Sequence, residues 1–179
     1  MPTILTHPVV ALALAPFVLH ARSGRALLAA GIACTILPDA DTLGRHLHVP
    51  ALELAHRGPT HSVAFAVVAA GAVAAAGRQA WRDVSAWHAF AFLFACVLSH
   101  GLLDMATNGG PGIALGWPFS DARLFWPWRP IAVSPLDAGR FLGERGARVL
   151  ASEALWLWLP GLAIAAAGLA WRKRREVAR

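Results

Sequence analysis

Five long apolar stretches constrain the fold of this chain more than any other feature. They cover residues 4–20, 27–37, 63–77, 87–103 and 155–171. A straight helix needs roughly 20 apolar residues to cross a bilayer, so the last two stretches are long enough, the third is adequate and the first two are short. Charged residues make up 15% of the sequence, against about 25% in an ordinary soluble domain. The sequence therefore predicts an all-α, polytopic membrane protein with about five apolar helices.

We interpret residues 1–179 as a single membrane-embedded domain. Its parts are a motif-bearing region at 4–127, an interfacial segment at 128–151, and a last span with a basic tail at 152–179. The first ten residues contain no Lys or Arg, whereas a secretory signal peptide begins with a positively charged region. We therefore expect the first apolar stretch to be a retained span rather than a cleaved leader.

The basic residues predict the orientation of the spans. Nine of the 16 Lys and Arg residues lie in short segments that five spans would place on one face, namely Arg22, Arg25, Arg78, Arg82, Arg172, Lys173, Arg174, Arg175 and Arg179. By the positive-inside rule this face is cytoplasmic. The expected location is thus the bacterial inner membrane, with an external N-terminus and a cytoplasmic C-terminus. Because no basic and aromatic residues alternate along a stripe, the sequence indicates the lipid bilayer, and not a nucleic acid, as the partner.

Seven His and Asp residues fall at the opposite, outer ends of four different apolar stretches. They are His7, Asp39, Asp41, His56, His61, His100 and Asp104. His100 and Asp104 are four residues apart, so on a helix they project from the same side. Polar groups at a membrane span cost several kcal/mol unless they are paired or coordinated. The convergence of seven such groups on one face predicts a shared purpose, which we interpret as metal binding.

The number of metal ions stays open at this point. Three or four ligands satisfy one zinc ion, whereas seven candidates suit a two-metal centre bridged by an Asp. Each motif also has an ordinary explanation when taken alone. The segment "PDAD" is a common helix stop, and the pair His100 and Asp104 is able to form a neutral hydrogen bond. "HRGPTH" is less ordinary, because it places two imidazoles on either side of a rigid turn.

Four motifs resemble, in order and spacing, the YdjM-like family of LexA-regulated, inner-membrane, metal-dependent hydrolases. These motifs are the N-terminal "HP", "LPDADTLG", "HRGPTHS" and "SHGLLDMATNGGPGIALGWPFS". The resemblance implies a membrane-embedded hydrolase with the seven His and Asp residues on the motif positions. The pattern is also similar, more remotely, to zinc-dependent phospholipase C, which makes a lipid or phosphoester substrate plausible.

The resulting hypothesis is hydrolysis of an ester or phosphoester by metal-activated water, with zinc as the expected cofactor. Asp39 or Asp41, whichever is not fully engaged by metal, would act as general base. Arg57 would stabilise the developing anion or orient a ligand carboxylate.

Two non-enzymatic alternatives remain. One is a divalent-metal transporter or sensor, and the other is an assembly protein in which the metal only holds helix ends together. A transporter would place polar residues near the bilayer midplane, where this chain has Ala, Val, Leu and Phe.

Overall fold

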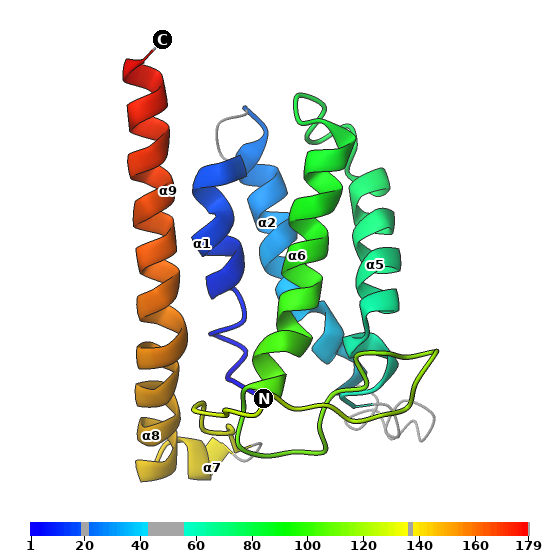
Figure 1. Cartoon of the computed structure of the whole chain (residues 1–179), viewed down its shortest axis with the longest axis vertical. Helices are drawn as coiled ribbons and strands as arrows, with labels where there is room; N and C mark the ends of the chain where they lie inside the picture. The colour runs from blue at the N-terminus through cyan, green and yellow to red at the C-terminus, as the bar shows by residue number, and fades with distance from the viewer. Residues whose placement is uncertain (19–21, 43–55, 136–137, 179) are drawn as a thin grey trace.

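The chain folds into an antiparallel bundle of helices (Figure 1). The structure is a computed structural model, and it describes residues 1–18, 22–42, 56–135 and 138–178. Its main helices are α1 (Val9–Val18), α2 (Gly24–Ile36), α5 (Val63–Ala76), α6 (Ala86–Met105) and the continuous rod formed by α8 (Glu144–Glu153), η3 (Ala154–Trp158) and α9 (Leu159–Val177). A four-residue helix, α7 (Ala138–Phe141), precedes that rod. Among the described residues only two isolated β-bridges occur, so the all-α prediction is confirmed.

Side-chain caps and prolines decide where the helices begin and end. The Ser62 hydroxyl accepts a hydrogen bond from the Phe65 amide and caps α5, and Ser85 caps α6 in the same way through the His88 amide. Such caps satisfy amide donors that have no partner inside the helix. Pro38 converts the end of α2 into the short 3-10 helix η1 (Leu37–Asp41). Pro59 begins a second one, η2 (Pro59–His61). Both short helices lie at the same end of the bundle.

The core lies where α2, α5 and α6 pack together, and glycines let two of these helices approach closely. Leu27, Phe92, Leu93 and Cys96 are buried there. A β-carbon at Gly31 of α2 would lie 2.4 Å from the Phe92 ring of α6. The rod α8–η3–α9 packs along α1 at the edge of the bundle (Figure 1). The free cysteines Cys34 and Cys96 are both buried.

The expectation of about five spanning helices is not confirmed by helix length. Within the described residues, two helices are long and apolar enough to cross a membrane, Ala86–Met105 and Glu144–Val177. Helices α1, α2 and α5 contain 10, 13 and 14 residues, and all three are shorter than the roughly 20 residues that a straight span needs. Residues 4–8, at the start of the first apolar stretch, form turns rather than a longer α1, because Pro8 disfavours helix in the residue before it.

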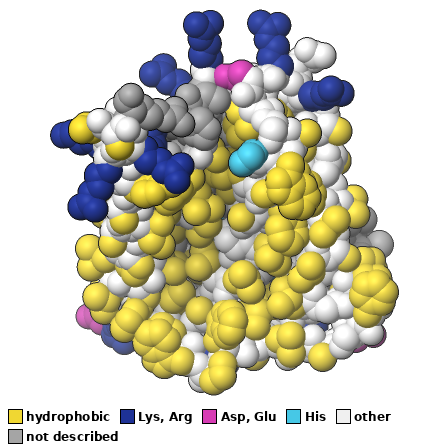
Figure 2. Space-filling view, turned by 45° about the horizontal axis from the view of Figure 1, so that its top comes forward, with side chains coloured by type: hydrophobic (Ala, Val, Ile, Leu, Met, Phe, Trp, Pro, Cys, Tyr) yellow, Lys and Arg dark blue, Asp and Glu magenta, His cyan; other side chains and the backbone are white. Residues whose placement is uncertain are grey.

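The two ends of the bundle differ in chemistry. Alternation of helix direction brings the end of α1, the start of α2, the turn between α5 and α6, and the end of α9 to the same end (Figure 1). Lys and Arg side chains gather there, above a band of hydrophobic side chains (Figure 2). The opposite end carries η1, η2 and the loop that follows α6. This arrangement places the candidate metal ligands and this group of basic residues at opposite ends of the molecule.

The segment predicted to be interfacial, residues 128–151, contains most of a helix, α8. It buries Gly146, Val149 and Glu153 on one face. Instead of ending before the last apolar stretch, it continues into it through the single π-helical turn η3. Glu153 is fully buried at this junction.

Substitution of Gly31 by Ala should destabilise the fold by about 1–3 kcal/mol, the usual cost of overpacking a core. The added methyl group would overlap the buried Phe92 ring. Gly71→Ala is the matched control, because Gly71 also lies inside a helix but its β-carbon would meet nothing within 4 Å. This control should be neutral or stabilising by up to about 1 kcal/mol, since Ala is a better helix former than Gly. Thermal unfolding in detergent, followed by circular dichroism, would measure both; equal shifts would contradict the packing described here.

Candidate metal centre

Five buried side chains meet at the end of the bundle that carries η1, η2 and the loop after α6. They are His7 from the turn before α1, Asp39 from η1, His61 from η2, and His100 and Asp104 from the last two turns of α6. Asp39 is 6% exposed and the other four are 3% exposed or less. We call this group the inner cluster. Three segments that are far apart in the sequence thus place side chains able to bind a metal ion next to the end of α6.

The ring nitrogens and carboxylate oxygens of the inner cluster lie close to one another. The Nε2 atom of His100 lies 3.2 Å from Oδ1 of Asp39, and Nε2 of His61 lies 3.7 Å from the same oxygen. Nε2 of His61 is also 3.8 Å from Oδ2 of Asp104. The imidazole rings of His7 and His100 stack with their centroids 3.8 Å apart. Two overlapping trios, His7 with Asp39 and His100, and His61 with His100 and Asp104, offer ligand atoms within 4.8 Å of one another.

The inner cluster contains an unusual concentration of buried atoms without hydrogen bonds. Across the described residues, every buried side-chain nitrogen or oxygen that lacks a hydrogen-bond partner belongs to this cluster. These atoms are both nitrogens of His7, Nε2 of His61 and of His100, and all four carboxylate oxygens of Asp39 and Asp104. Buried polar groups in proteins are nearly always hydrogen-bonded, because leaving one unpaired costs about 1–3 kcal/mol. The cluster is therefore arranged for a partner other than the surrounding protein.

Hydrogen bonds around His61 determine which of its nitrogens faces the cluster as an acceptor. The Thr60 hydroxyl donates to Oδ2 of Asp41 at 2.8 Å, and its oxygen lies 2.9 Å from Nδ1 of His61. Because that hydroxyl proton is already used, Nδ1 must be the donor to Thr60. In a neutral ring Nε2 then carries a lone pair. The hydrogen bonds from His61 to Thr60 and from Thr60 to Asp41 thus fix the ring so that this lone pair points at the inner cluster. We call this chain of hydrogen bonds the relay.

His100 is oriented in the same manner by the backbone of α2. Its Nδ1 donates to the carbonyl oxygen of Thr35 at 2.7 Å, so Nε2 again carries the lone pair in a neutral ring. Histidines that bind metals usually donate their second ring nitrogen to a carbonyl or carboxylate, which fixes the tautomer. Both His61 and His100 have this arrangement.

Arg57 holds the second carboxylate of the inner cluster. Its Nε lies 3.3 Å from Oδ2 of Asp104, and its Nη atoms donate to the Gly109 carbonyl at 2.8 Å and the Thr107 hydroxyl at 3.3 Å. The side chain is 1% exposed, and its backbone has φ 61°, which few residues other than Gly adopt. Of the two roles considered from the sequence, this geometry favours orientation of a ligand carboxylate over contact with substrate.

Asp41 and His56 form an outer pair beside the inner cluster. Nδ1 of His56 lies 3.0 Å from Oδ1 of Asp41, while the other carboxylate oxygen accepts from Thr60. Both oxygens of Asp41 are therefore engaged, unlike those of Asp39. The His56 side chain is 20% exposed, which makes it the most accessible of the seven predicted residues. A third trio, Asp39 with His56 and His61, also offers atoms within 4.8 Å of one another.

Burial and charge set the protonation of the cluster members that lie outside the long helices. Burial lowers the pKa of the His7 and His61 imidazoles. For Asp39, burial raises the pKa, but the neighbouring His100 and His61 imidazoles lower it by more, so the net pKa lies below the ordinary range. At neutral pH this corresponds to neutral imidazoles and an ionised carboxylate. These are the forms in which both groups bind metal ions.

Several residues that support the site carried no recognisable signal in the sequence. Glu153 accepts hydrogen bonds from the Thr3 amide at 2.5 Å and from the Thr3 and Thr6 hydroxyls at 2.7 Å each. This buried carboxylate fixes the turn that precedes His7 and ties it to the start of the last long helix. Thr60 and the Thr35 carbonyl were missed for the same reason, since common residues acquire these roles only through tertiary contacts. His20, His46 and His48 lie outside the described residues.

The fold and the site together define a class, an all-helical membrane protein with a buried His and Asp cluster at one end of its bundle. The chain belongs to the YdjM inner membrane protein family, which matches it over residues 1–177. It is 39% identical to the inner membrane protein YbcI of Escherichia coli (strain K12) over 176 residues, which cover 98% of this chain and 100% of that protein. No solved structure matches the chain. The predicted family and its inner-membrane location are confirmed.

Thr60→Val should weaken metal binding by about 10–100-fold, the usual effect of removing a group that orients a metal ligand. The substitution keeps the shape of the side chain but removes the hydroxyl between Asp41 and His61. Zinc titration of the purified protein against a competing chelator would measure the change. Thr35→Val is the matched control, because its buried hydroxyl donates to Ile32 while its backbone carbonyl, which holds His100, is retained. Equal loss in both variants would contradict the relay.

Proposed function

We propose that this protein is a membrane-embedded, metal-dependent hydrolase that acts on an ester or phosphoester of a lipid or another envelope-associated substrate. One observation carries the proposal, the concentration in the inner cluster of buried nitrogen and oxygen atoms without hydrogen bonds. Nε2 of His61 and of His100 lies 3.7 and 3.2 Å from the Asp39 carboxylate without making a hydrogen bond. In neutral rings these nitrogens are acceptors that face an acceptor, and such groups repel each other unless a cation lies between them.

The donor set fits a divalent transition metal. Imidazole nitrogens with carboxylate oxygens suit zinc in particular. Arg57 offsets the charge of Asp104, whereas within the described residues no Lys or Arg forms an ion pair with the Asp39 carboxylate. His7, Asp39, His61, His100 and Asp104 would hold one ion, and His56 and Asp41, which contact each other, are left for proton transfer. A metal bound there would supply Lewis acidity and lower the pKa of bound water.

The outer pair suits proton transfer at the accessible edge of the site. Asp41 holds Nδ1 of His56, which leaves Nε2 as a proton acceptor beside the inner cluster. A carboxylate that orients an imidazole in this way also stabilises its protonated form. We therefore assign the general base to His56, positioned by Asp41, in place of the Asp residues considered from the sequence alone. Arg57 acts through Asp104, which it orients.

The topology that we propose has five membrane-embedded helical segments, with the metal centre at the outer face. Two features support it. The basic residues of the turn between α5 and α6 and of the end of α9 lie at the opposite end of the bundle (Figures 1 and 2), as the positive-inside rule requires. Trp117, Trp126 and Trp128 are exposed in the loop after α6, at the end that carries the site, and Trp is enriched at membrane interfaces. These aromatic side chains also suit contact with a lipid substrate.

The topology predicts where reporters fused to the protein are active. A reporter placed after Arg179 should be cytoplasmic, and one inserted near Ala138 should be external. Paired fusions to alkaline phosphatase and green fluorescent protein would test both sites, because each reporter is active on one side of the membrane. The reverse pattern would move the metal centre to the cytoplasmic face and change the accessible substrates.

Loss of an inner ligand should abolish metal binding and hydrolysis together. His100→Ala removes a ligand whose ring is fixed from α2, so elemental analysis should find the purified variant depleted of zinc. The same preparation should lose turnover of bis-p-nitrophenyl phosphate and of phospholipid in vesicles. His56→Gln should separate the two readouts, with zinc content near normal and turnover lowered by about 10²–10⁴-fold, the usual contribution of a general base.

The outcome distinguishes an enzyme from a metal-stapled assembly protein. That alternative is favoured by one observation, the near-complete burial of the inner cluster. If well-folded, zinc-loaded protein hydrolyses none of a broad set of esters and phosphoesters, and His100→Ala lowers only thermal stability, the metal is structural. Thr35→Val serves here too as a folding control.

A further inference from the structure

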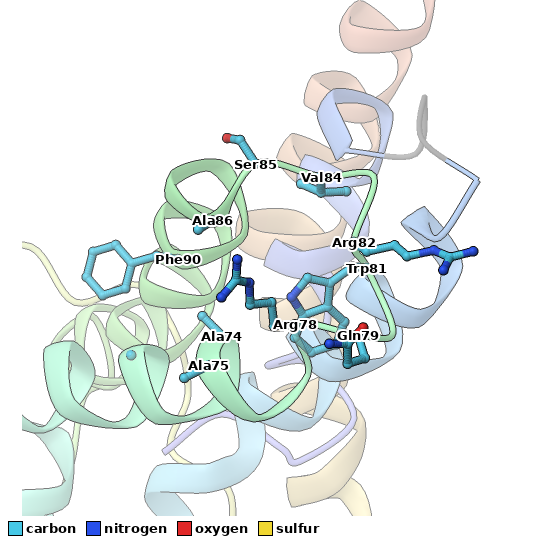
Figure 3. A pocket seen from close by; sticks show the side chains of 11 residues that line it. Ala74, Ala75, Arg78, Gln79, Trp81, Arg82, Val84, Ser85, Ala86 and Phe90 are labelled. Atoms are coloured by element: carbon cyan, nitrogen blue, oxygen red, sulfur yellow. The ribbon is translucent and has the colours of Figure 1, made fainter.

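A pocket of about 940 Å³ opens between α5 and α6 at the basic end of the bundle (Figure 3). It lies at the opposite end from the metal centre and shares no residue with it. Gly71, Ala74 and Ala75 of α5 line one side, and Ala86 and Phe90 of α6 line the other. The turn between the helices contributes the polar part of the lining. Pockets of roughly 300–1,000 Å³ are the usual size for small-molecule sites.

The turn is folded so that an indole ring forms part of the pocket wall. Trp81 is 6% exposed and packs back over Gly77, where a β-carbon would lie within 2 Å of the ring. A glycine at this position is therefore required for the observed packing. The pocket wall is a built feature of the fold rather than a gap between mobile side chains.

The charged residues of the lining are all basic. Arg78 and Arg82 both line the pocket, and no Asp or Glu does. Figure 3 shows the Arg78 side chain reaching toward Phe90 on α6 with the Trp81 indole beside it, whereas Arg82 extends away. The acidic residue of the turn, Asp83, is engaged by the amide and hydroxyl of Ser23. Within the described part of the chain, Arg78 has no acidic partner, so its guanidinium is available to an anion.

Aromatic side chains extend from this pocket along α6. Trp87, at the start of α6, is 71% exposed, as expected for an aromatic residue at the membrane interface. Its ring stacks on Phe90 at 5.6 Å, and Phe90 stacks on Phe94 at 5.9 Å. On α5, Gly71 leaves open space beside the helix. An apolar path therefore leads from the guanidinium of Arg78 toward the middle of the bundle.

We propose that this pocket binds an anionic phospholipid, with the phosphate on Arg78 and one acyl chain between α5 and α6. A guanidinium is well suited to phosphate, and basic pockets between membrane helices bind anionic headgroups. The apolar path favours a lipid over a free phosphate, which would leave that path unoccupied. The proposal uses none of the metal-centre residues and holds whether or not the protein is an enzyme.

Native mass spectrometry of the detergent-solubilised protein would test the proposal by titration with phosphatidylglycerol and phosphatidylcholine. Phosphatidylglycerol should bind more tightly. Arg78→Gln should weaken its binding by about fivefold, the change that corresponds to about 1 kcal/mol per basic residue near an anionic lipid. Gly71→Leu should also weaken it by filling the acyl path, since a β-carbon at this position meets nothing within 4 Å. Glycerol phosphate should not compete.

Arg25→Gln is the matched control, because Arg25 is an exposed basic residue at the same end but does not line the pocket. It should bind phosphatidylglycerol as the unaltered protein does. Zinc content and thermal stability should be unchanged in all three variants, which separates lipid binding from folding. Equal weakening by Arg25→Gln would indicate a diffuse charge effect, and full competition by glycerol phosphate would indicate a soluble anion; either result would overturn the proposal.

Discussion

Repulsion among the buried acceptors of the inner cluster is the constraint on which the rest of the structure depends. Oδ1 of Asp39 lies 3.7 Å from Nε2 of His61 and 3.2 Å from Nε2 of His100, all three atoms are buried without hydrogen bonds, and in neutral rings all three are acceptors. Such an arrangement is stable only with a cation among them, or when the surrounding protein holds each group so firmly that it cannot turn away. In this structure the surrounding protein holds the cluster through four sets of contacts. Thr60 and Asp41 hold His61, the α2 backbone holds His100, Arg57 holds Asp104, and Glu153 holds the turn before His7. A preorganised set of donors is what selective metal binding requires.

The helical bundle and the meeting of the ligands could be predicted from the sequence because both follow from the order of apolar and polar segments. Antiparallel connection of consecutive helices makes every second turn lie at the same end, so His7, Asp39, His61 and His100 had to be near one another once the apolar stretches were recognised. Helix lengths could not be predicted as well. The first apolar stretch begins at residue 4, but α1 begins only after Pro8, and apolar character continues to residues 37–38, where Pro38 ends the α-helical pattern of α2. Hydropathy measures burial or contact with lipid, and it does not measure where a helix stops.

The division of the seven residues into an inner cluster and an outer pair was beyond the sequence. Asp39 and Asp41 are two residues apart and look equivalent as letters, yet the 3-10 geometry of η1 turns one carboxylate toward His100 and the other toward Thr60 and His56. Arg57 likewise looks like a residue for substrate, because nothing in "HRGPTH" tells that the Gly109 carbonyl and Asp104 will surround its guanidinium. Roles that depend on which lone pair is free are properties of the tertiary structure, and the sequence identifies only the candidates.

The exposure of His56 bears on whether the centre performs chemistry. A metal that only staples helix ends needs ligands on every side and gains nothing from an accessible imidazole, whereas a hydrolytic centre needs an opening where substrate and a proton acceptor meet. In this chain the Asp41 carboxylate links the accessible His56 to the buried His61. It contacts His56 directly and reaches His61 through Thr60. Protonation of His56 would therefore change the charge balance of the relay that orients His61. If the centre is hydrolytic as proposed, this coupling would connect proton transfer at the edge of the site to the geometry of its interior.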